Sequence, residues 1–234
     1  MLLQLVRARR RQVLIDINTQ RDFLLASGSA CIRNHRRVLA HIRRMMAWAR
    51  TNDVSIISMC DAPVNGNGSP YHARNGGLQK VRYTLVNNHL RFSPDNNTDL
   101  PRDMLRQYKQ VILPNRCHDP FDEPRIDRLL SEIRAGEFIV IGTSVEGAVA
   151  ATVLGLLQRH KAVTVVTDAV GGHDSHNAKM ALRKMEAKGA TMIETKRLAG
   201  TSHLRLVGVC DCDSCRRLLA KTAQTSSDST PPPH

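Results

Sequence analysis

Short runs of β-branched and aliphatic residues recur along the chain, and stretches with helical spacing separate them. The runs lie at 13–17, 54–58, 111–114, 138–142, 163–167 and 191–195. Most are continuously apolar, which is typical of parallel strands that helices cover on both faces. Strands that alternate with helices predict a three-layer, Rossmann-like α/β fold with a roughly six-stranded, mainly parallel sheet.

The helices are marked by apolar residues at helical spacing. These residues fall at 38–49, 126–133, 149–157 and 178–185. Asp122 and Pro124 are expected to open the second helix, and the run His173 to His176 is expected to be the polar start of the last one.

Domain boundaries follow from composition. Residues 1–209 are predicted to form one α/β domain. Within it, 61–103 lacks periodicity and is rich in Asn, Gly and Pro, which predicts a long loop or lid with a short hairpin at 81–86. Residues 210–221 form a Cys-rich C-terminal clip, and 222–234 are expected to be a disordered tail.

The charge is strongly basic, with 34 Lys and Arg against 21 Asp and Glu and a formal net charge of +13. Such a field attracts polyanions, so nucleic-acid binding is one alternative function. The even spread of Arg along the chain and an aromatic content of only 3% argue against a dedicated single-strand platform. No apolar run approaches the ~20 residues of a membrane span, and the N-terminus places apolar residues before basic ones, unlike a secretory signal. We therefore expect a cytoplasmic protein without membrane association.

Polar residues gather where the expected strands end. Asn18, Asp61, Asn115 and Asp168 each follow a strand, and so does the turn 142–148. Because the carboxyl ends of parallel strands meet at one edge of a sheet, where ligands bind, these residues predict a small-molecule site.

Three sequence motifs lie at these strand ends. The first reads N-T-Q-R-D-F from 18 to 23, the second N-R-C-H-D-P-F from 115 to 121, and the third G-T-S-V-E-G-A-V from 142 to 149. In this order they resemble the isochorismatase-like cysteine hydrolases, a family that includes nicotinamidases. The likeness covers roughly residues 10–200 and implies a homo-oligomer, either a dimer or a tetramer.

The resemblance also implies where a pocket lies. It assigns binding positions to Asp22, Phe23, Asp61, His72, Phe121, Thr143, Ser144 and Gly147. It further implies a cis peptide bond between Thr143 and Ser144, just before the family's nucleophile turn.

All three catalytic positions of the family are substituted. In the family a Cys thiolate attacks a carbonyl, an Asp moves the proton and a Lys stabilises the thiolate. The matching positions here hold Ala148, Asn18 and Asn115, and an amide offers neither a carboxylate base nor a positive charge. The sequence therefore predicts a family member without thiol-dependent hydrolysis that acts as a ligand-binding, regulatory or assembly protein.

The first alternative is an active hydrolase that uses other residues with a bound water. Asp16 stands two residues before Asn18 and, by strand period, points to the same side. Cys117 and Glu146 are the other weak substitutes. Cys117 is followed by a His and an Asp, but neighbours on an extended strand point to opposite faces, so they are poorly placed for a triad.

A metal site is predicted only near the C-terminus. Cys210, Cys212 and Cys215 put three soft ligands within six residues, and His203 is a candidate fourth ligand for Zn²⁺. The alternative is an exposed tail that contains three thiols. No cofactor is expected in the pocket, because the metal-binding Asp-x-His pair of nicotinamidases is reduced here to Asp61 without the His.

Overall fold

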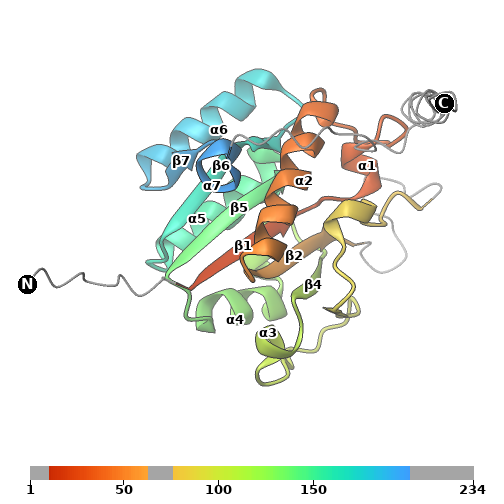
Figure 1. The fold of residues 1–234 in the computed structure, drawn as a ribbon, viewed down its shortest axis with the longest axis vertical. Coiled ribbons are helices and arrows are strands. Elements are labelled where there is room, and N and C mark those ends of the chain that lie inside the picture. The colour runs from red at the N-terminus through yellow and green to blue at the C-terminus, as the bar shows by residue number, and fades with distance from the viewer. Residues whose placement is uncertain (1–10, 63–75, 201–234) are drawn as a thin grey trace, which may run out of the picture.

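The computed structural model describes residues 11–62 and 76–200, and they form one parallel sheet between two layers of helices (Figure 1). The strands are β1 (Gln12–Ile17), β2 (Ser55–Asp61), β3 (His89–Arg91), β4 (Gln110–Asn115), β5 (Glu137–Thr143), β6 (Val163–Gly171) and β7 (Thr191–Ile193). Their order is β3-β4-β2-β1-β5-β6-β7, and every neighbouring pair is parallel. The predicted α/β class is confirmed, with seven strands where about six were expected.

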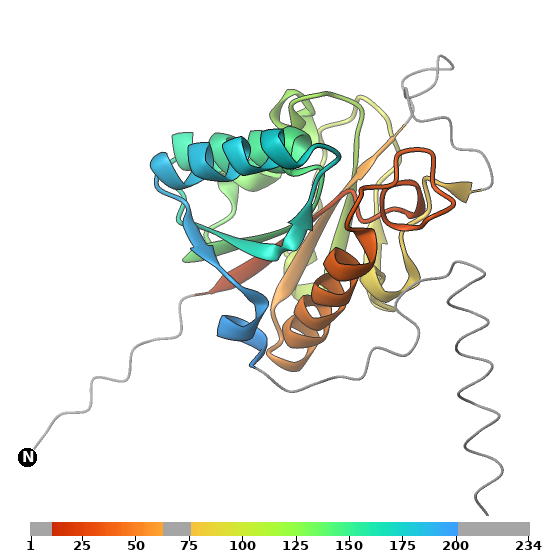
Figure 2. The same ribbon diagram turned by 90° about the horizontal axis from the view of Figure 1, so that it is seen from above.

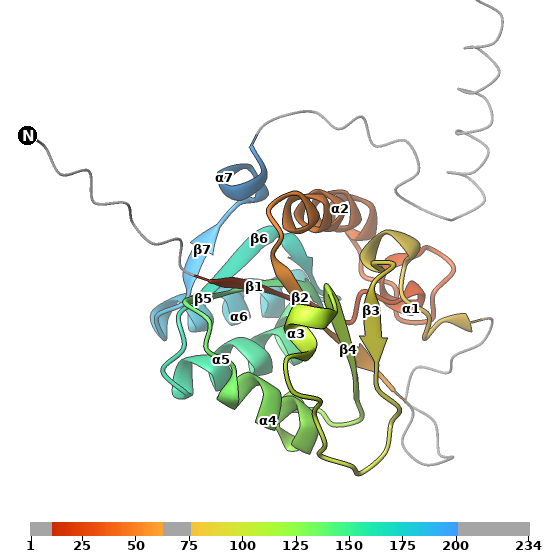
Figure 3. The ribbon, with the colours of Figure 1, turned by 60° about the horizontal axis from the view of Figure 1, so that its bottom comes forward.

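Helices cover both faces of the sheet. They are α1 (Arg21–Leu24), α2 (His35–Thr51), α3 (Met104–Gln107), α4 (Pro124–Glu132), α5 (Ala150–Gln158), α6 (Ser175–Ala187) and α7 (Thr195–Ala199). Short 3₁₀ helices η2 (Arg82–Thr84) and η3 (Pro120–Asp122) and a π-helical turn η4 (Val145–Val149) connect them. Helices α2 and α7 lie on one side of the sheet, and α4, α5 and α6 lie on the other (Figures 2 and 3).

The alternation of side chains along β1 divides the core into these two layers. Val13, Ile15 and Ile17 pack with the residues of α4 and α5, whereas Leu14 packs with those of α2. Successive strand residues point to opposite faces, so a continuously apolar strand fills both layers at once.

Two local predictions need correction. The segment 81–86, expected to be a hairpin, contains η2, and the chain continues to β3, which pairs in parallel with β4. Asp122 lies inside η3, so α4 begins at Pro124, in the first helical position where a missing N–H costs nothing. The polar start of α6 is confirmed, because the Asp174 side chain accepts a hydrogen bond from Asn177 N.

Within the described ranges, no helix has the length and apolar character needed to cross a bilayer.

Candidate functional site

The sheet brings three of the predicted strand-end residues, Asn18, Asp61 and Asn115, together at one place, which we call the carboxyl edge. The prediction for Asp168 was wrong: this residue lies inside β6, and its carboxylate accepts from Thr195 N at 2.8 Å and from the Thr195 hydroxyl at 2.7 Å. Asp61 pairs with Asn115 across β2 and β4, and Asn18 N donates to Met59 O at 2.8 Å. The hydroxyl of Thr143, at the end of β5, donates to Asn18 O at 2.9 Å. The four central strands therefore place these residues side by side, as the parallel topology predicted.

Asn18 and Gln20 join the ends of β1 and β2. Asn18 has a left-handed φ of 47°, which turns the chain out of the strand. Its side-chain oxygen and that of Gln20 both accept from Asp61 N, at 3.1 and 2.8 Å. The Gln20 amide donates to Asp61 O and Leu78 O at 2.9 and 2.8 Å. Gln20 was not among the predicted site residues, although it lies in the first motif.

Asn115, which the resemblance predicts to stand at the position of the family lysine, is buried. Its side-chain oxygen accepts from Cys117 N at 3.3 Å, and its backbone oxygen accepts from Ala62 N at 2.9 Å. These bonds stabilise the turn after β4, and the amide brings no positive charge to the edge.

The next residue, Arg116, supplies a cation, but Glu123 binds it. The carboxylate accepts from Arg116 N at 2.7 Å, Nε at 2.8 Å and Nη2 at 3.0 Å. Burial opposes ionisation of Glu123, yet these hydrogen bonds outweigh it and lower its pKa. The same hydrogen bonds raise the pKa of Arg116. This nearly buried pair anchors the loop that enters α4.

Cys117 lies beside the same carboxylate, and its surroundings oppose a thiolate. Burial raises the pKa of the Cys117 thiol, and the charges of Glu123 and Asp122 raise it further. A nucleophilic cysteine needs the opposite, a lowered pKa near cations or a helix N-terminus. Asp119, the acid of the adjacent Cys-His-Asp run, caps η3 by accepting from Phe121 N at 2.9 Å.

Ala148 lies in the turn η4 that leads into α5, where the family resemblance places the nucleophile. The peptide bond between Thr143 and Ser144 is cis, as that resemblance implied. Thr152, one turn on, donates its hydroxyl to Ala148 O at 2.7 Å.

Glu146 connects this turn to the loop after β6. One of its carboxylate oxygens accepts from His173 N at 2.7 Å, and the other is buried against Gly172. A Cβ on Gly172 would lie 2.0 Å from that oxygen, so a larger residue there would require the Glu146 carboxylate to move. Glu146 thus fixes the geometry of the turn.

Asp16 lies away from the carboxyl edge and is fully buried. Its carboxylate accepts from Lys80 Nζ at 2.6 Å and from the Ser58 hydroxyl at 2.8 Å. Lys80 also donates to the Thr19 hydroxyl at 2.7 Å, and its side chain is 1% exposed. By strand alternation Asp16 shares the face of Leu14, under α2. Its burial there places it out of reach of a ligand, which opposes its predicted role as a substitute acid.

The other expected binding residues are mostly part of the packing. Asp22 is buried against Gly77 and accepts from Ser29 N at 3.3 Å, and Phe23 belongs to the core under α2. Phe121 lies under the Arg159 guanidinium, 3.9 Å from its ring centre. Thr143 is buried, whereas Ser144 and Gly147 are partly exposed.

The described parts of the chain hold no group of three or more His, Cys, Asp or Glu side chains arranged to bind a metal ion. His72 and the predicted zinc ligands His203, Cys210, Cys212 and Cys215 lie outside the described residues.

The seven-stranded parallel sheet with helices on both faces defines the class of α/β proteins. The family model of the isochorismatase domain matches residues 12–197, and the chain belongs to this family. No curated protein matches the chain significantly.

Solved structures show the same fold at low sequence identity. Pyrazinamidase of Pyrococcus horikoshii in complex with zinc is 19% identical over 79% of this chain and 99% of that one, with a TM-score of 0.60. Pyrazinamidase/nicotinamidase of Streptococcus mutans is 18% identical over 78% and 99%, with a TM-score of 0.62. The MAR1 ribonuclease of Caenorhabditis elegans is 19% identical over 96% of this chain and 97% of its own, with a TM-score of 0.55.

Proposed function

We propose that this isochorismatase-family protein has no thiol-dependent hydrolase activity and works by binding. The observation that carries the proposal is Ala148, a methyl group at the turn before α5 where the family resemblance places the attacking thiolate. The second support is the use of Asn18 and Asn115 as hydrogen-bond acceptors for backbone N–H groups.

The alternative of a hydrolase with substitute residues has weaker support. Asp16 is buried with Lys80, Glu146 binds the backbone of His173, and the pKa of Cys117 is raised. A general base must lie within hydrogen-bond reach of the proton it removes, and an attacking thiol must ionise.

Amide hydrolysis tests the proposal directly. Ammonia release from nicotinamide and pyrazinamide is measured with the wild type, Cys117→Ser and a matched Cys31→Ser control. We expect no release above the uncatalysed rate from any of them. Turnover that iodoacetamide or Cys117→Ser abolishes, and that Cys31→Ser leaves intact, would contradict the proposal.

A gain-of-function series sharpens this test. The single variant Ala148→Cys is expected to stay inactive, since Asn18 and Asn115 supply neither base nor cation. The matched variant restores all three residue types of the family's chemistry. It combines Asn18→Asp, Asn115→Lys and Ala148→Cys. Activity in the single variant alone would show that another residue already acts as the base.

We infer a second function, association with nucleic acid. It is supported by the net charge of +13 and by the arginine-lined groove described below. The MAR1 ribonuclease of C. elegans aligns with 96% of this chain, and its name motivates RNA as the polyanion to test. A homo-oligomer and a cytoplasmic location are part of the same proposal.

A further inference from the structure

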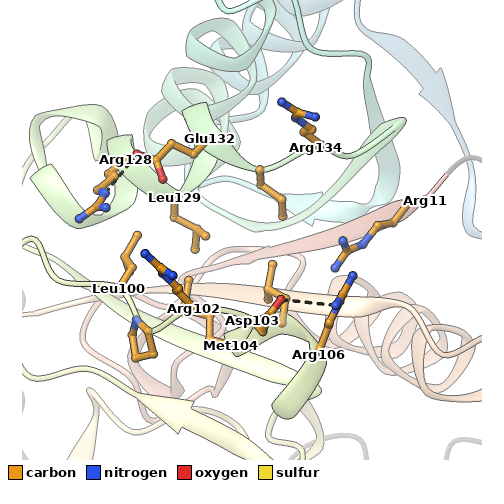
Figure 4. A pocket seen from close by; sticks show the side chains of 13 residues that line it. Arg11, Leu100, Arg102, Asp103, Met104, Arg106, Arg128, Leu129, Glu132 and Arg134 are labelled. Carbon is orange, nitrogen blue, oxygen red and sulfur yellow. Dashed lines mark hydrogen bonds and ion pairs between the residues drawn. The ribbon is translucent and has the colours of Figure 1, made fainter.

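A groove opens at the amino ends of the strands, on the side of the sheet opposite to the carboxyl edge. It lies between the segment 100–106, which enters α3, and the C-terminal half of α4, with Arg11 at the start of β1 closing one end (Figure 4). Its volume is about 480 Å³, within the range of small-molecule sites. None of the site residues predicted from the sequence lines it.

Arginine dominates the rim of this amino-edge groove. The rim carries five arginines and two acids, so it holds a net charge of +3; these residues are Arg11, Arg102, Arg106, Arg128, Arg134, Asp103 and Glu132. Both acids pair with nearby arginines: Asp103, just before α3, with Arg106 at 3.6 Å, and Glu132 with Arg128 on α4 at 3.1 Å. Within the described ranges, no acid lies at ion-pair distance from the remaining three arginines.

The arginines approach one another across the groove. The guanidinium of Arg11 points toward that of Arg106, and the side chain of Arg102 reaches into the space between the walls (Figure 4). Like charges held this way repel one another, and an anion between them removes the repulsion. Guanidinium groups bind phosphate oxygens through paired hydrogen bonds, which makes arginine the side chain best suited to this ligand.

The floor of the groove is apolar. Leu100, Met104, Leu129 and Ile133 line it beneath the charged rim. A ligand that fills the groove therefore needs an anionic group for the rim and a body with an apolar face for the floor. A nucleotide has both, since every base has a flat face beside its phosphate.

We propose that the amino-edge groove binds the phosphate of a nucleotide, either free or within an RNA strand. This inference rests on the second function proposed above, and it names the site for it. Although arginine is spread evenly along the sequence, folding gathers arginines from 11, 102–106 and 128–134 around one groove.

The test measures binding to a 5′-phosphorylated, fluorescein-labelled 12-nucleotide RNA by anisotropy, and to adenosine monophosphate by calorimetry. The groove variant is Arg102→Ser with Arg134→Ser. The matched control is Arg36→Ser with Arg37→Ser, which removes two exposed arginines from the start of α2. Thermal unfolding checks that both variants fold.

We expect the groove variant to bind at least about tenfold more weakly than the wild type, and the control within about threefold. The slope of log affinity against log salt falls by about one to two units in the groove variant. If adenosine monophosphate competes with the RNA, a free nucleotide is a sufficient ligand of the groove. If only the RNA binds, the ligand is a nucleotide within a strand. Either result, together with weaker binding by the groove variant, supports the groove.

Two kinds of outcome overturn the inference, and only one of them also rejects the proposed nucleic-acid binding. Equal weakening in both double variants, or none in the groove variant, rejects the groove and leaves nucleic-acid binding in place. A wild type that binds neither probe at 100 mM salt rejects both the groove and the second proposed function.

Discussion

At the carboxyl edge, the side-chain oxygens of Asn18, Gln20 and Asn115 accept hydrogen bonds from backbone N–H groups of the strand ends and turns. At the amino edge, by contrast, Arg102 and Arg134 are exposed and have no acidic partner within the described ranges. The first arrangement is a scaffold, because each of these polar atoms already has a protein partner. The second keeps hydrogen-bond donors and charge available to a ligand. The difference predicts that substitutions near the first region change stability, and those in the second change binding.

The largest effect is expected from Lys80→Met, which leaves the buried carboxylate of Asp16 without its cation. Breaking a buried ion pair on one side costs about 3–5 kcal/mol in the free energy of unfolding. Urea denaturation measures it. The exposed pair of Lys196 and Glu194 offers the matched control, and Lys196→Met is expected to leave the free energy of unfolding nearly unchanged.

A double variant tests whether the unpaired charge of Asp16 causes the loss of stability. Adding Asp16→Asn to Lys80→Met removes the unpaired charge and is expected to recover part of the lost stability. A Lys80→Met variant as stable as the wild type would show that the buried Lys80–Asp16 pair does not stabilise the fold.

An intermediate effect is expected from Glu123→Gln, at about 2 kcal/mol, because charge-assisted hydrogen bonds to Arg116 are weakened. The folded-state pKa of Glu123 is lowered from 4.5, so its contribution is complete above about pH 4.5 and is lost as the pH falls through the folded value. The variant lacks this part of the acid dependence. Glu186→Gln, at an exposed site on α6, is the control and keeps the wild-type profile. Identical acid titrations of stability for wild type and Glu123→Gln would reject the bidentate pair.

The smallest effect is expected in the groove. Arg102→Ser with Arg134→Ser is predicted to change the unfolding free energy by no more than about 0.5 kcal/mol per site, since both side chains are exposed and unpaired. Chemical denaturation without phosphate in the buffer measures it. A loss above about 2 kcal/mol would make these arginines part of the scaffold and remove the contrast between the two edges.

The sheet was predictable because its strands are encoded locally. The apolar runs at 13–17 and 138–142 lie inside β1 and β5. The strand β3 was missed, since its three residues carry no run or alternation and it forms only by pairing with β4. For the same reason, the sequence predicts a loop over 61–103, the segment that contains β3.

The candidate site was predictable in position but not in contacts. The strand-end rule placed Asn18 and Asn115 at one edge, and the topology confirms it. Lys80 could not be foreseen, because its partner Asp16 is 64 residues away and only the fold joins them. The groove was missed for a similar reason, as its arginines come from three separate segments.

The two outermost strands of the described sheet, β3 and β7, have three residues each, and the apolar strands lie between them. A long exposed edge of apolar strand invites another chain to add to it and start an aggregate. Here the available ladder is short, and His89 and Arg91 flank the one apolar residue of β3. The central strands are covered by strand neighbours on both sides and cannot pair with another chain. They include the apolar stretch Phe-Ile-Val-Ile of β5, a composition that is prone to aggregate when exposed.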